Sequence, residues 1–436
     1  MMTSDGKAAF LQAPLSERIY MRAPPGYSSV NSEGCEEVWE LHKAIYGLKQ
    51  ASNAFWNAIH SHLIEKGFES ILGDPCLFRR VALDGSVILV CTYIDDVTYA
   101  VSSQEAADSF LAELRERFVI DEGEGKPIEW LLGMSVTQDL NAGTVHMQME
   151  LAITKLALGI LTSEEIVKSK SVRYPMLAQP LSRETENLIP KDQFDYLSVI
   201  GSLLHITNCV RPDVAASIGV LSRFSNSPGA SHVRACKRVV MYLYNTRRYG
   251  ITYRRSDEHN SVPLMYAGAQ HPLDNGTNLL QVFADSDYAG DETRRSTMGA
   301  VTMMNGGPIS WSSVLGKTVA TSTCEAEVNA AVYAAKDALH VSRMLADLGY
   351  ATGNKPLQIA EDNSACIAQA NSGLRHVRNA KHYEVKLRFL QQLVVDKDVE
   401  FVYCPTDHQL ADIFTKPLDE AKFVYFRDLL VSEAKS

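Results

Sequence analysis

The chain lacks the features of secreted and membrane proteins. No apolar run approaches the roughly 18 residues that span a bilayer. The N-terminal stretch MMTSDGKAAFLQ has no charged segment followed by an apolar one, as a secretory signal would. Eight cysteines are scattered through 436 residues without a Cys-x-x-Cys pair, so neither a disulfide framework nor a zinc site is indicated. We therefore expect an intracellular protein, in the cytoplasm or the nucleus, with no membrane partner.

The chain also lacks an excess of positive charge, because its 52 acidic residues outnumber its 42 lysines and arginines. The formal net charge of −10 argues against a generic nucleic-acid-binding surface, so any such contact has to come from local basic patches or metal ions. The chain has 4 tryptophans, and none closely flanks the acids discussed below, which counts against a carbohydrate hydrolase. A composition of 46% hydrophobic and 22% charged residues is that of a globular protein with large cores. The length predicts two or three domains.

The most informative stretch is Tyr93-Ile94-Asp95-Asp96, which lies between two runs rich in Val, Ile, Tyr and Thr. Such runs predict strands, with the two acids at the tip of a hairpin. Side chains alternate along a strand, so one carboxylate could face a reaction centre while the other supports it. Two carboxylates this close repel each other, and a hard divalent cation relieves the repulsion. A polar turn is the alternative, because Asp is common in turns.

The order of predicted elements divides the chain into three segments. The first, 1–175, contains helix candidates over 43–67 and 102–118 on either side of the Asp-Asp hairpin. The second, 176–277, is mostly helical by pattern. The third, 278–425, begins with strands and a long helix, continues with a strand, helices and a strand, and ends in a helix. This last order predicts an α/β sandwich with a mixed sheet.

Four acids stand out in the last segment. Asp285 lies in its first strand and Glu327 in the first turns of the long helix, whereas Asp362 ends a strand and Asp412 lies early in the terminal helix. Strand ends and helix starts can converge at one sheet edge, where four acids would hold two Mg²⁺ ions. Two metals can clamp the attacking water and the leaving oxygen of a phosphoryl displacement. Taken singly, each acid could instead be a helix-start acid, a cap or a solvated turn residue.

Several sequence blocks together resemble the Pol polyprotein of copia-type retrotransposons, that is, its reverse transcriptase followed by RNase H. The blocks include LHKAIYGLKQASNAFW, YIDDVTYAV, WLLGMSV, FADSDYAGDETRRSTMGAV, STCEAEVNAA, EDNSACIAQA and YCPTDHQLADIFTKPL. The resemblance covers nearly the whole chain. It implies an α/β (α+β) fold class: a truncated polymerase palm with a Tyr-x-Asp-Asp hairpin over 1–175, a helical connection over 176–277 and an RNase H-like mixed-sheet domain over 278–425.

The resemblance assigns roles to residues of the first segment. Asp5 corresponds to the first palm aspartate and, with Asp95, would bind two Mg²⁺ or Mn²⁺ ions, with Asp96 beside them. Phe10 matches the aromatic residue that excludes ribonucleotides by crowding the 2′-oxygen, although a core aromatic is an equal alternative. A template- and nucleotide-binding turn would be formed by Tyr46, Gly47, Lys49 and Gln50.

The resemblance also assigns the acids of the last segment to the RNase H site, where they would bind a second pair of ions: Asp285, Glu327, Asp362 and Asp412. Glu325 is a rival for Glu327, but the phase Glu-Val-Asn-Ala favours Glu327. His408 lies one helical turn before Asp412, where it could assist product release or simply be an exposed helix-start residue. His382 receives no role.

The implied activities are RNA-directed DNA polymerase and RNase H. The implied partners are primer–template nucleic acid, deoxynucleoside triphosphates and an RNA–DNA hybrid, and the oligomeric state is not predicted. The family carries a long fingers region before its first palm aspartate, whereas four residues precede Asp5 here, and Ser52 replaces a usual Pro. We therefore expect truncation to impair the polymerase half. The alternative is a non-catalytic retroelement remnant that at most binds nucleic acid.

Overall fold

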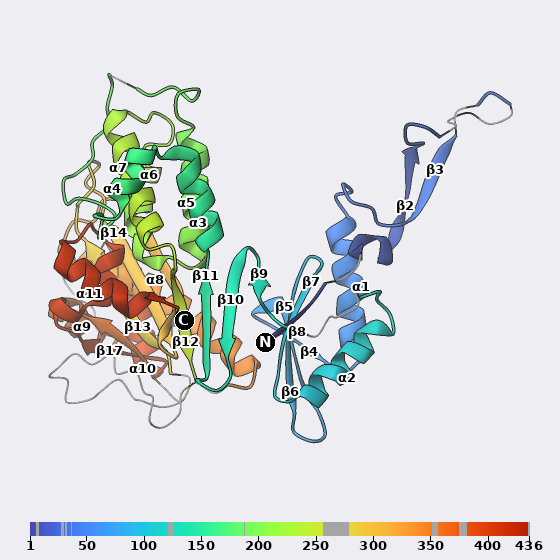
Figure 1. Cartoon of the computed structure of the whole chain (residues 1–436). Helices are drawn as coiled ribbons and strands as arrows, with labels where there is room; N and C mark the ends of the chain where they lie inside the picture. Colours follow the sequence, from blue (N-terminus) through green and yellow to red (C-terminus); the bar gives the residue numbers. More distant parts are fainter. Residues whose placement is uncertain are drawn as a thin grey trace. The chain divides into compact units, whose positions relative to one another are not determined.

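The computed structural model describes residues 1–5, 8–27, 30, 33–35, 37–120, 126–186, 188–255, 279–350, 356–374 and 382–434. For Ser4 and Asp5 it describes the backbone alone. The chain forms two compact units, Met1–Ile128 with Asp347–Gly349, and Glu129–Ala346 with Tyr350–Ser436 (Figure 1). Within the described ranges, no helix combines the length and the apolar character that crossing a membrane requires.

The first unit is built on a six-stranded antiparallel sheet in the order β4-β5-β6-β7-β1-β8. Alternate residues such as Ile88, Val90 and Tyr99 are buried, as expected for strands with one covered face. They share a core with Phe55 of the first helix and Phe110 of the second. The elements are β1 (Met2–Asp5), η1 (Ala9–Gln12), α1 (Ala51–Glu65), β4 (Glu69–Ile71), β5 (Asp74–Val81), β6 (Val87–Tyr93), β7 (Asp96–Val101), α2 (Gln104–Arg115) and β8 (Lys126–Pro127).

A two-stranded ribbon of β2 (Pro14–Arg22) and β3 (Val38–Lys43) extends from the helical side of this unit (Figure 1). Most of its residues are exposed. Its root is fixed by a backbone hydrogen bond of 3.0 Å from Ala44 N to Ala13 O. The ribbon thereby brings the segment before β2 next to the segment after β3.

The second unit contains a five-stranded mixed sheet in the order β15-β14-β13-β16-β17. The β13–β16 and β16–β17 pairs are parallel, and the other two pairs are antiparallel. This confirms the α/β class and the mixed sheet that the order of elements predicts. The elements are β13 (Gln281–Asp287), β14 (Thr297–Met304), β15 (Gly307–Leu315), α8 (Thr323–Asp347), β16 (Leu357–Glu361), α9 (Ser364–Ala370), α10 (Glu384–Val395) and β17 (Val399–Tyr403).

Side chains alternate between the two faces of the mixed sheet, and each face is covered by helices. On one face Val282 and Ala284 pack in a core shared with α8, α9 and α10. On the other face Phe283 and Val301 join a larger core made with helices from earlier and later in the chain. Those helices are α3 (Glu150–Ile160), α4 (Ser163–Ser169), α5 (Tyr196–Cys209), η2 (Pro212–Val214), α6 (Ala215–Ser222), α7 (Ala230–Asn245), η4 (Leu410–Phe414) and α11 (Glu420–Leu430).

The second unit also contains a smaller five-stranded sheet in the order β18-β12-β11-β10-β9. Its strands are β9 (Trp130–Leu131), β10 (Met134–Asp139), β11 (Thr144–Gln148), β12 (Tyr249–Arg254) and β18 (Ser432–Glu433). Met134 and Ile153 pack in the same core as Phe283. The two units divide between Ile128 and Glu129. The boundary at 277 lies outside the described residues, and the three-segment division stays a prediction.

One helix begins later than the sequence suggests. We expect a terminal helix from His408 onward, but the structure has short 3-10 turns, η3 (Thr406–His408) and η4, and α11 begins at Glu420. Pro417 explains the break, since it lacks an N–H and disfavours helical backbone at the residue before it. Asp419 then starts α11 by accepting a hydrogen bond of 3.1 Å from Lys422 N.

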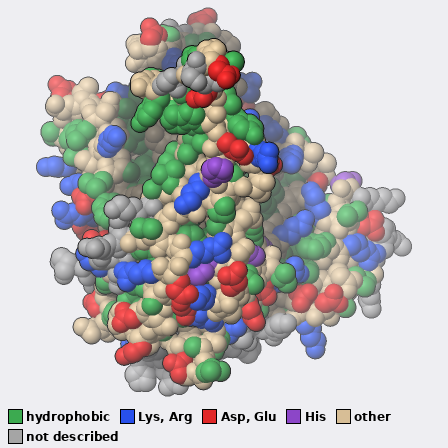
Figure 2. Space-filling view, turned by 90° about the vertical axis from the view of Figure 1, so that its right-hand side faces the viewer, with side chains coloured by type: hydrophobic (Ala, Val, Ile, Leu, Met, Phe, Trp, Pro, Cys, Tyr) green, Lys and Arg blue, Asp and Glu red, His purple; other side chains and the backbone are tan. Residues whose placement is uncertain are grey.

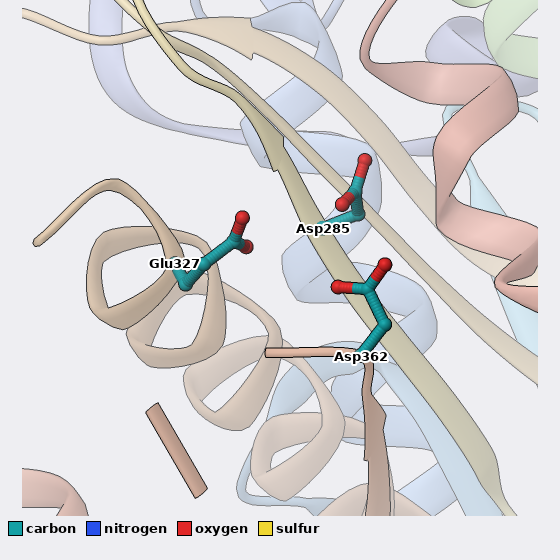
Figure 3. Close-up of side chains that lie close together, drawn as sticks. All are labelled: Asp285, Glu327 and Asp362. Atoms are coloured by element: carbon teal, nitrogen blue, oxygen red, sulfur yellow. The ribbon is translucent and has the colours of Figure 1, made fainter. Parts of the chain in front are cut away.

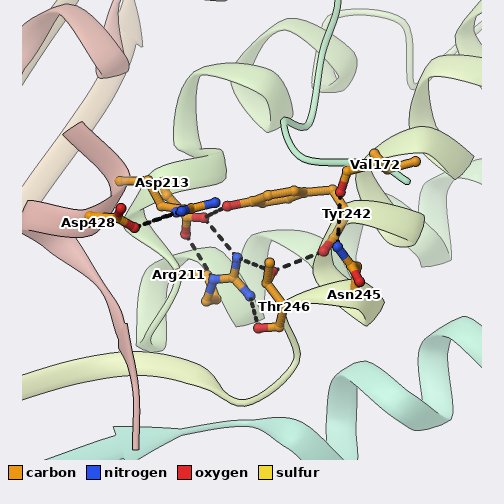
Figure 4. A network of polar contacts seen from close by, with 8 residues as sticks. Val172, Arg211, Asp213, Tyr242, Asn245, Thr246 and Asp428 are labelled. Atoms are coloured by element: carbon orange, nitrogen blue, oxygen red, sulfur yellow. Dashed lines mark hydrogen bonds and ion pairs between the residues drawn. The ribbon is translucent and has the colours of Figure 1, made fainter. Parts of the chain in front are cut away.

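A buried ion pair lies between η2 and the C-terminal end of α7 in the second unit (Figure 4). Arg211 has no exposed surface, and its Nε and Nη2 donate to the two carboxylate oxygens of Asp213 at 2.9 and 2.8 Å. Arg211 Nη1 also donates to Thr246 O at 3.0 Å, and the Tyr242 hydroxyl donates to Asp213 at 2.5 Å. The network ties η2 to α7 with its charges paired and hydrogen-bonded, as a buried pair requires.

Candidate active sites

Three of the predicted acids lie together beside the mixed sheet, with side chains directed toward a common space (Figure 3). Asp285 lies near the end of β13, Asp362 directly follows β16, and Glu327 lies in the first turns of α8. One carboxylate oxygen from each falls within 4.8 Å of the others. β13 and β16 are parallel neighbours, so their C-terminal ends meet at the same sheet edge.

Burial and mutual repulsion dominate the electrostatics of this cluster. Burial, followed by the charge of Asp412, raises the pKa of Asp285 to about 7. Burial, followed by the charge of Asp285, raises the pKa of Glu327 to about 9. Glu327 Oε2 is buried and has no hydrogen-bond partner among the described residues. Crowded carboxylates with an unpaired buried oxygen fit a hard divalent cation, which prefers oxygen ligands.

Asp412 lies beside this cluster but is held differently. Its buried carboxylate pairs with Lys416 Nζ at 2.9 Å and with Lys422 Nζ at 2.5 Å. Burial acts to raise the pKa of Asp412, but the hydrogen bond from Lys422 and the charge of Lys416 outweigh it, so the pKa lies below its ordinary value. The structure thus brings three predicted acids within 4.8 Å of one another and places the fourth next to Asp285, between two lysines.

The structure separates the two glutamates of the Glu-Ala-Glu sequence. Glu325 Oε2 accepts hydrogen bonds from Thr321 N at 2.7 Å and from Thr321 Oγ1 at 2.8 Å, so it stabilises the start of α8. Glu327 instead joins the acid cluster. His408 Nδ1 lies 3.2 Å from the Tyr425 hydroxyl, and His382 is exposed.

In the first unit, the Tyr-x-Asp-Asp sequence forms the predicted hairpin. Tyr93 ends β6, Asp96 begins β7, and these two residues pair across the turn. Ile94 in the turn has φ 55°, a strained value for a β-branched residue and one that often marks functional sites. Burial, followed by the charge of Asp95, raises the pKa of Asp96.

The strand that carries Asp5 lies beside this hairpin. β1 pairs with β7 in antiparallel fashion, and Asp5 is opposite Asp96 in the register. The side chain of Asp5 lies outside the described part of the chain. Its approach to the carboxylate of Asp95 therefore stays a prediction, whereas the neighbouring placement of the two strands is observed.

The predicted nucleotide-binding residues also come together. The rings of Phe10 and Tyr46 lie 4.6 Å apart between centroids, although 8% of Phe10 is exposed and 59% of Tyr46. Gly47 has φ +99°, a left-handed conformation that glycine adopts without strain. Lys49 and Gln50 are exposed where α1 begins. Phe10 is thus both a core residue and a neighbour of the predicted binding turn.

Several residues near the acid cluster are missing from the sequence-based prediction. Thr415 Oγ1 donates to Asp285 Oδ2 at 2.8 Å, and Thr406 Oγ1 donates to Asp362 Oδ2 at 2.7 Å. Glu361 is fully buried, and burial followed by the charge of Glu327 raises its pKa well above the ordinary value. The sequence offers one indication of these residues, because polar residues lie next to the recognised acids along the chain. Other supporting residues are Lys416, Lys422 and Gln409.

Charges of both signs are interspersed on the surface displayed in Figure 2. Lys and Arg side chains lie among Asp and Glu side chains over this face, rather than in one block. The net charge of −10 therefore does not prevent local basic groups from meeting a phosphate backbone.

Comparison with known proteins agrees with these features. Residues 2–178 match the family described as reverse transcriptase (RNA-dependent DNA polymerase). The chain is 27% identical over 435 residues to the retrovirus-related Pol polyprotein from transposon TNT 1-94 of Nicotiana tabacum, matching 98% of this chain but 30% of that protein. It is 32% identical over 312 residues to a transposon Ty5-1 protein of Saccharomyces cerevisiae, covering 71% of this chain and 91% of that one.

Among solved structures, a compost-derived RNase H1 is 19% identical and covers 33% of this chain and 99% of its own, with a TM-score of 0.26. At this score the fold assignment rests on the strand order and cores described above. The family assignment rests on the sequence relatives. The chain spans 30% of the length of the tobacco polyprotein. On this evidence, and as its sequence motifs predict, the chain belongs to the family of retrotransposon Pol polyproteins.

Proposed function

We propose that the second unit is a divalent-metal-dependent ribonuclease that cleaves the RNA strand of an RNA–DNA hybrid. The observation that carries this proposal is the convergence of Asp285, Glu327 and Asp362 within 4.8 Å. When bound there, two Mg²⁺ or Mn²⁺ ions would supply an activated water and stabilise the leaving oxygen. The lack of any Ser/His/Asp arrangement among the recognised motifs agrees with chemistry in which protein acids mainly hold metal.

The residues around the cluster would orient these acids. The Thr415 hydroxyl holds Asp285 and the Thr406 hydroxyl holds Asp362, each through one carboxylate oxygen. Lys416 and Lys422 balance the charge of Asp412 and keep it ionised. The hybrid would be recognised partly by its 2′-hydroxyls.

A direct test is cleavage of a labelled RNA–DNA hybrid by the purified full chain in Mg²⁺ and in Mn²⁺. We expect RNA-strand cleavage that Asp362→Asn abolishes, because one ligand of the cluster is lost. Asp396→Asn, at an exposed acid after α10, is the matched control and should keep the activity. If the wild-type chain cleaves nothing in Mn²⁺, the non-catalytic remnant becomes the better interpretation.

We further propose that the first unit is an RNA-directed DNA polymerase, acting on primer–template nucleic acid and deoxynucleoside triphosphates. The supporting observation is the pairing of β1, which carries Asp5, with β7, which begins at Asp96. Primer extension by the wild type and its loss in Asp95→Asn would support this function. An intracellular location belongs to the same proposal, supported by eight cysteines that are scattered without a Cys-x-x-Cys pair.

A further inference from the structure

A buried glutamine bridges the two strands that carry Asp285 and Asp362. The paired residues of β13 and β16 end with Phe283 and Ala360. At this point the Nε2 group of Gln409 donates to Ala284 O at 3.0 Å and to Ala360 O at 3.2 Å. The side-chain amide thus continues the link between the strands where their own pairing stops.

The same glutamine also fixes the turn that carries Asp412. Gln409 Oε1 accepts from Ala411 N at 3.3 Å, and Gln409 O accepts from Asp412 N at 3.0 Å. Gln409 has no exposed surface. Gln409 is therefore hydrogen-bonded to the backbone at three places: at the residue before Asp285, at the residue two positions before Asp362, and at Asp412 itself. Its contacts in these three segments are all with backbone groups, so it acts on the acids through the chain that carries them.

We propose that Gln409 is a positioning residue that sets the separation of Asp285 and Asp362 for binding a divalent cation. The inference rests on the proposed nuclease function, because it assumes that the cluster holds metal. Parallel strands that part at their ends have no ladder hydrogen bond to fix their spacing. An amide with two donors supplies that constraint, and no apolar side chain of the same length can replace it. Groups that orient metal ligands without touching the metal typically change its affinity substantially.

The test compares Mn²⁺ binding to the full chain and to Gln409→Met, by titration followed with electron paramagnetic resonance. Methionine keeps the length and removes the donors, and we expect affinity to fall about tenfold. Gln391→Met is the matched control. Gln391 is also fully buried, and its Nε2 donates to Gln369 O at 3.1 Å and to Ser372 Oγ at 3.0 Å, neither of which belongs to β13, β16 or η4. Both variants should lose thermal stability, but the control should bind Mn²⁺ like the wild type.

Equal Mn²⁺ affinity in Gln409→Met and the wild type would overturn the proposal, as would an equal loss in the Gln391→Met control. If Gln409→Met does not fold, Gln409→Asn keeps the amide but shortens its reach by one methylene. That variant is expected to show the same loss of affinity, and wild-type affinity would count against the proposal.

A second measurement separates this inference from the nuclease proposal. Hydrogen exchange, followed by mass spectrometry, should become faster in Gln409→Met for peptides that contain Asp285 or Asp362, and stay unchanged there in Gln391→Met. If the wild type binds no Mn²⁺, the nuclease proposal fails, and exchange still decides whether Gln409 holds the strand ends. Unchanged exchange at both peptides would show that it does not.

Discussion

Thr415 and Asp285 are 130 positions apart in sequence, and Thr415 Oγ1 donates a hydrogen bond of 2.8 Å to Asp285 Oδ2. The same hydroxyl oxygen lies 3.0 Å from Asp412 O. This contact stabilises the ionised form of a carboxyl group whose pKa burial has raised to about 7. It therefore links the η4 turn to the proton affinity of the predicted metal site.

Thr415→Val should weaken metal binding near neutral pH. Valine keeps the shape of threonine and removes the donor, so the pKa of Asp285 rises further and protons compete better with the metal. We expect about a tenfold loss of Mn²⁺ affinity at pH 7, in line with a hydrogen bond to a charged group. The loss should shrink at pH 9. Thr415→Ser keeps the hydroxyl and should behave like the wild type, and a pH-independent defect would contradict the argument.

Glu325 and Glu327 form a natural pair for testing which acid serves the cluster. Glu327→Gln should abolish hybrid cleavage and Mn²⁺ binding, because it removes one of the three converging carboxylates. Glu325→Gln keeps an oxygen acceptor for Thr321 but removes the negative charge at the start of α8, and should destabilise the helix by about 0.3–1 kcal/mol, with cleavage retained. Cleavage assays and thermal unfolding of both variants check this. The opposite pattern of activities would assign the role to Glu325.

How much of this site is predictable from sequence depends on how far apart in sequence the contacting residues lie. Asp285, Glu327 and Asp362 are visible because each lies in a recognisable strand-end or helix-start pattern, and the structure brings them together. The sequence does not reveal Thr415 and Gln409, because their hydrogen bonds to β13 join residues 130 and 125 positions apart. Contacts of such long sequence separation produce no recognisable local pattern. The expected helix over Asp412 is instead a short 3-10 turn, and Pro417 separates this turn from α11 because it disfavours helical backbone at Lys416.

Stability of the metal-free chain should fall as pH rises. In the unfolded chain the pKa values of Asp285 and Glu327 are near 4. In the folded chain burial raises the pKa of Asp285 to about 7 and that of Glu327 to about 9. Between these values the folded chain binds more protons than the unfolded chain, so the free energy of unfolding decreases with rising pH. Urea unfolding of the wild type should show this decrease from pH 5 to pH 9. Glu327→Gln should show a smaller decrease, and a wild-type curve that is flat over this range would contradict the assigned shifts.

Added metal should weaken that pH trend. A divalent cation bound by the three carboxylates offsets their repulsion, and binding to the folded state stabilises it by mass action. Mn²⁺ should therefore raise the unfolding midpoint more at pH 8 than at pH 5, because protons compete less at the higher pH. The Glu327→Gln variant is the control and should show little response at either pH.

The buried pair of Arg211 and Asp213 should matter for stability rather than for activity. Arg211→Met leaves the Asp213 charge buried without its cation and should cost about 3–5 kcal/mol of unfolding free energy. Tyr242→Phe removes one hydrogen bond and should cost about 1–3 kcal/mol. The double variant Arg211→Met/Asp213→Leu should recover much of the loss. Denaturant unfolding of the second unit, followed by hydrogen exchange, measures these differences.

Phe10 offers a test of the polymerase proposal that separates a core role from a role in nucleotide selection. Phe10 contacts the exposed ring of Tyr46, so its side chain lies next to the predicted nucleotide-binding turn as well as in the core. If it crowds the 2′-oxygen, Phe10→Val should raise the efficiency of ribonucleotide relative to deoxynucleotide incorporation at least about tenfold, since removing a steric block lowers a barrier by 1.4 kcal/mol or more. The large-to-small change should also cost stability.

The control for that loss of stability is Phe68→Val, at a buried aromatic of the same core that contacts Phe110 and Arg80. It should destabilise the first unit to a similar extent without changing the ratio of ribonucleotide to deoxynucleotide incorporation. Single-nucleotide primer extension with each triphosphate gives the ratio for both variants and the wild type. If the two variants change it equally, Phe10 is a core residue and the selection role is wrong. If Phe10→Val alone changes the ratio, the core residue Phe10 is also the residue that selects deoxyribonucleotides over ribonucleotides.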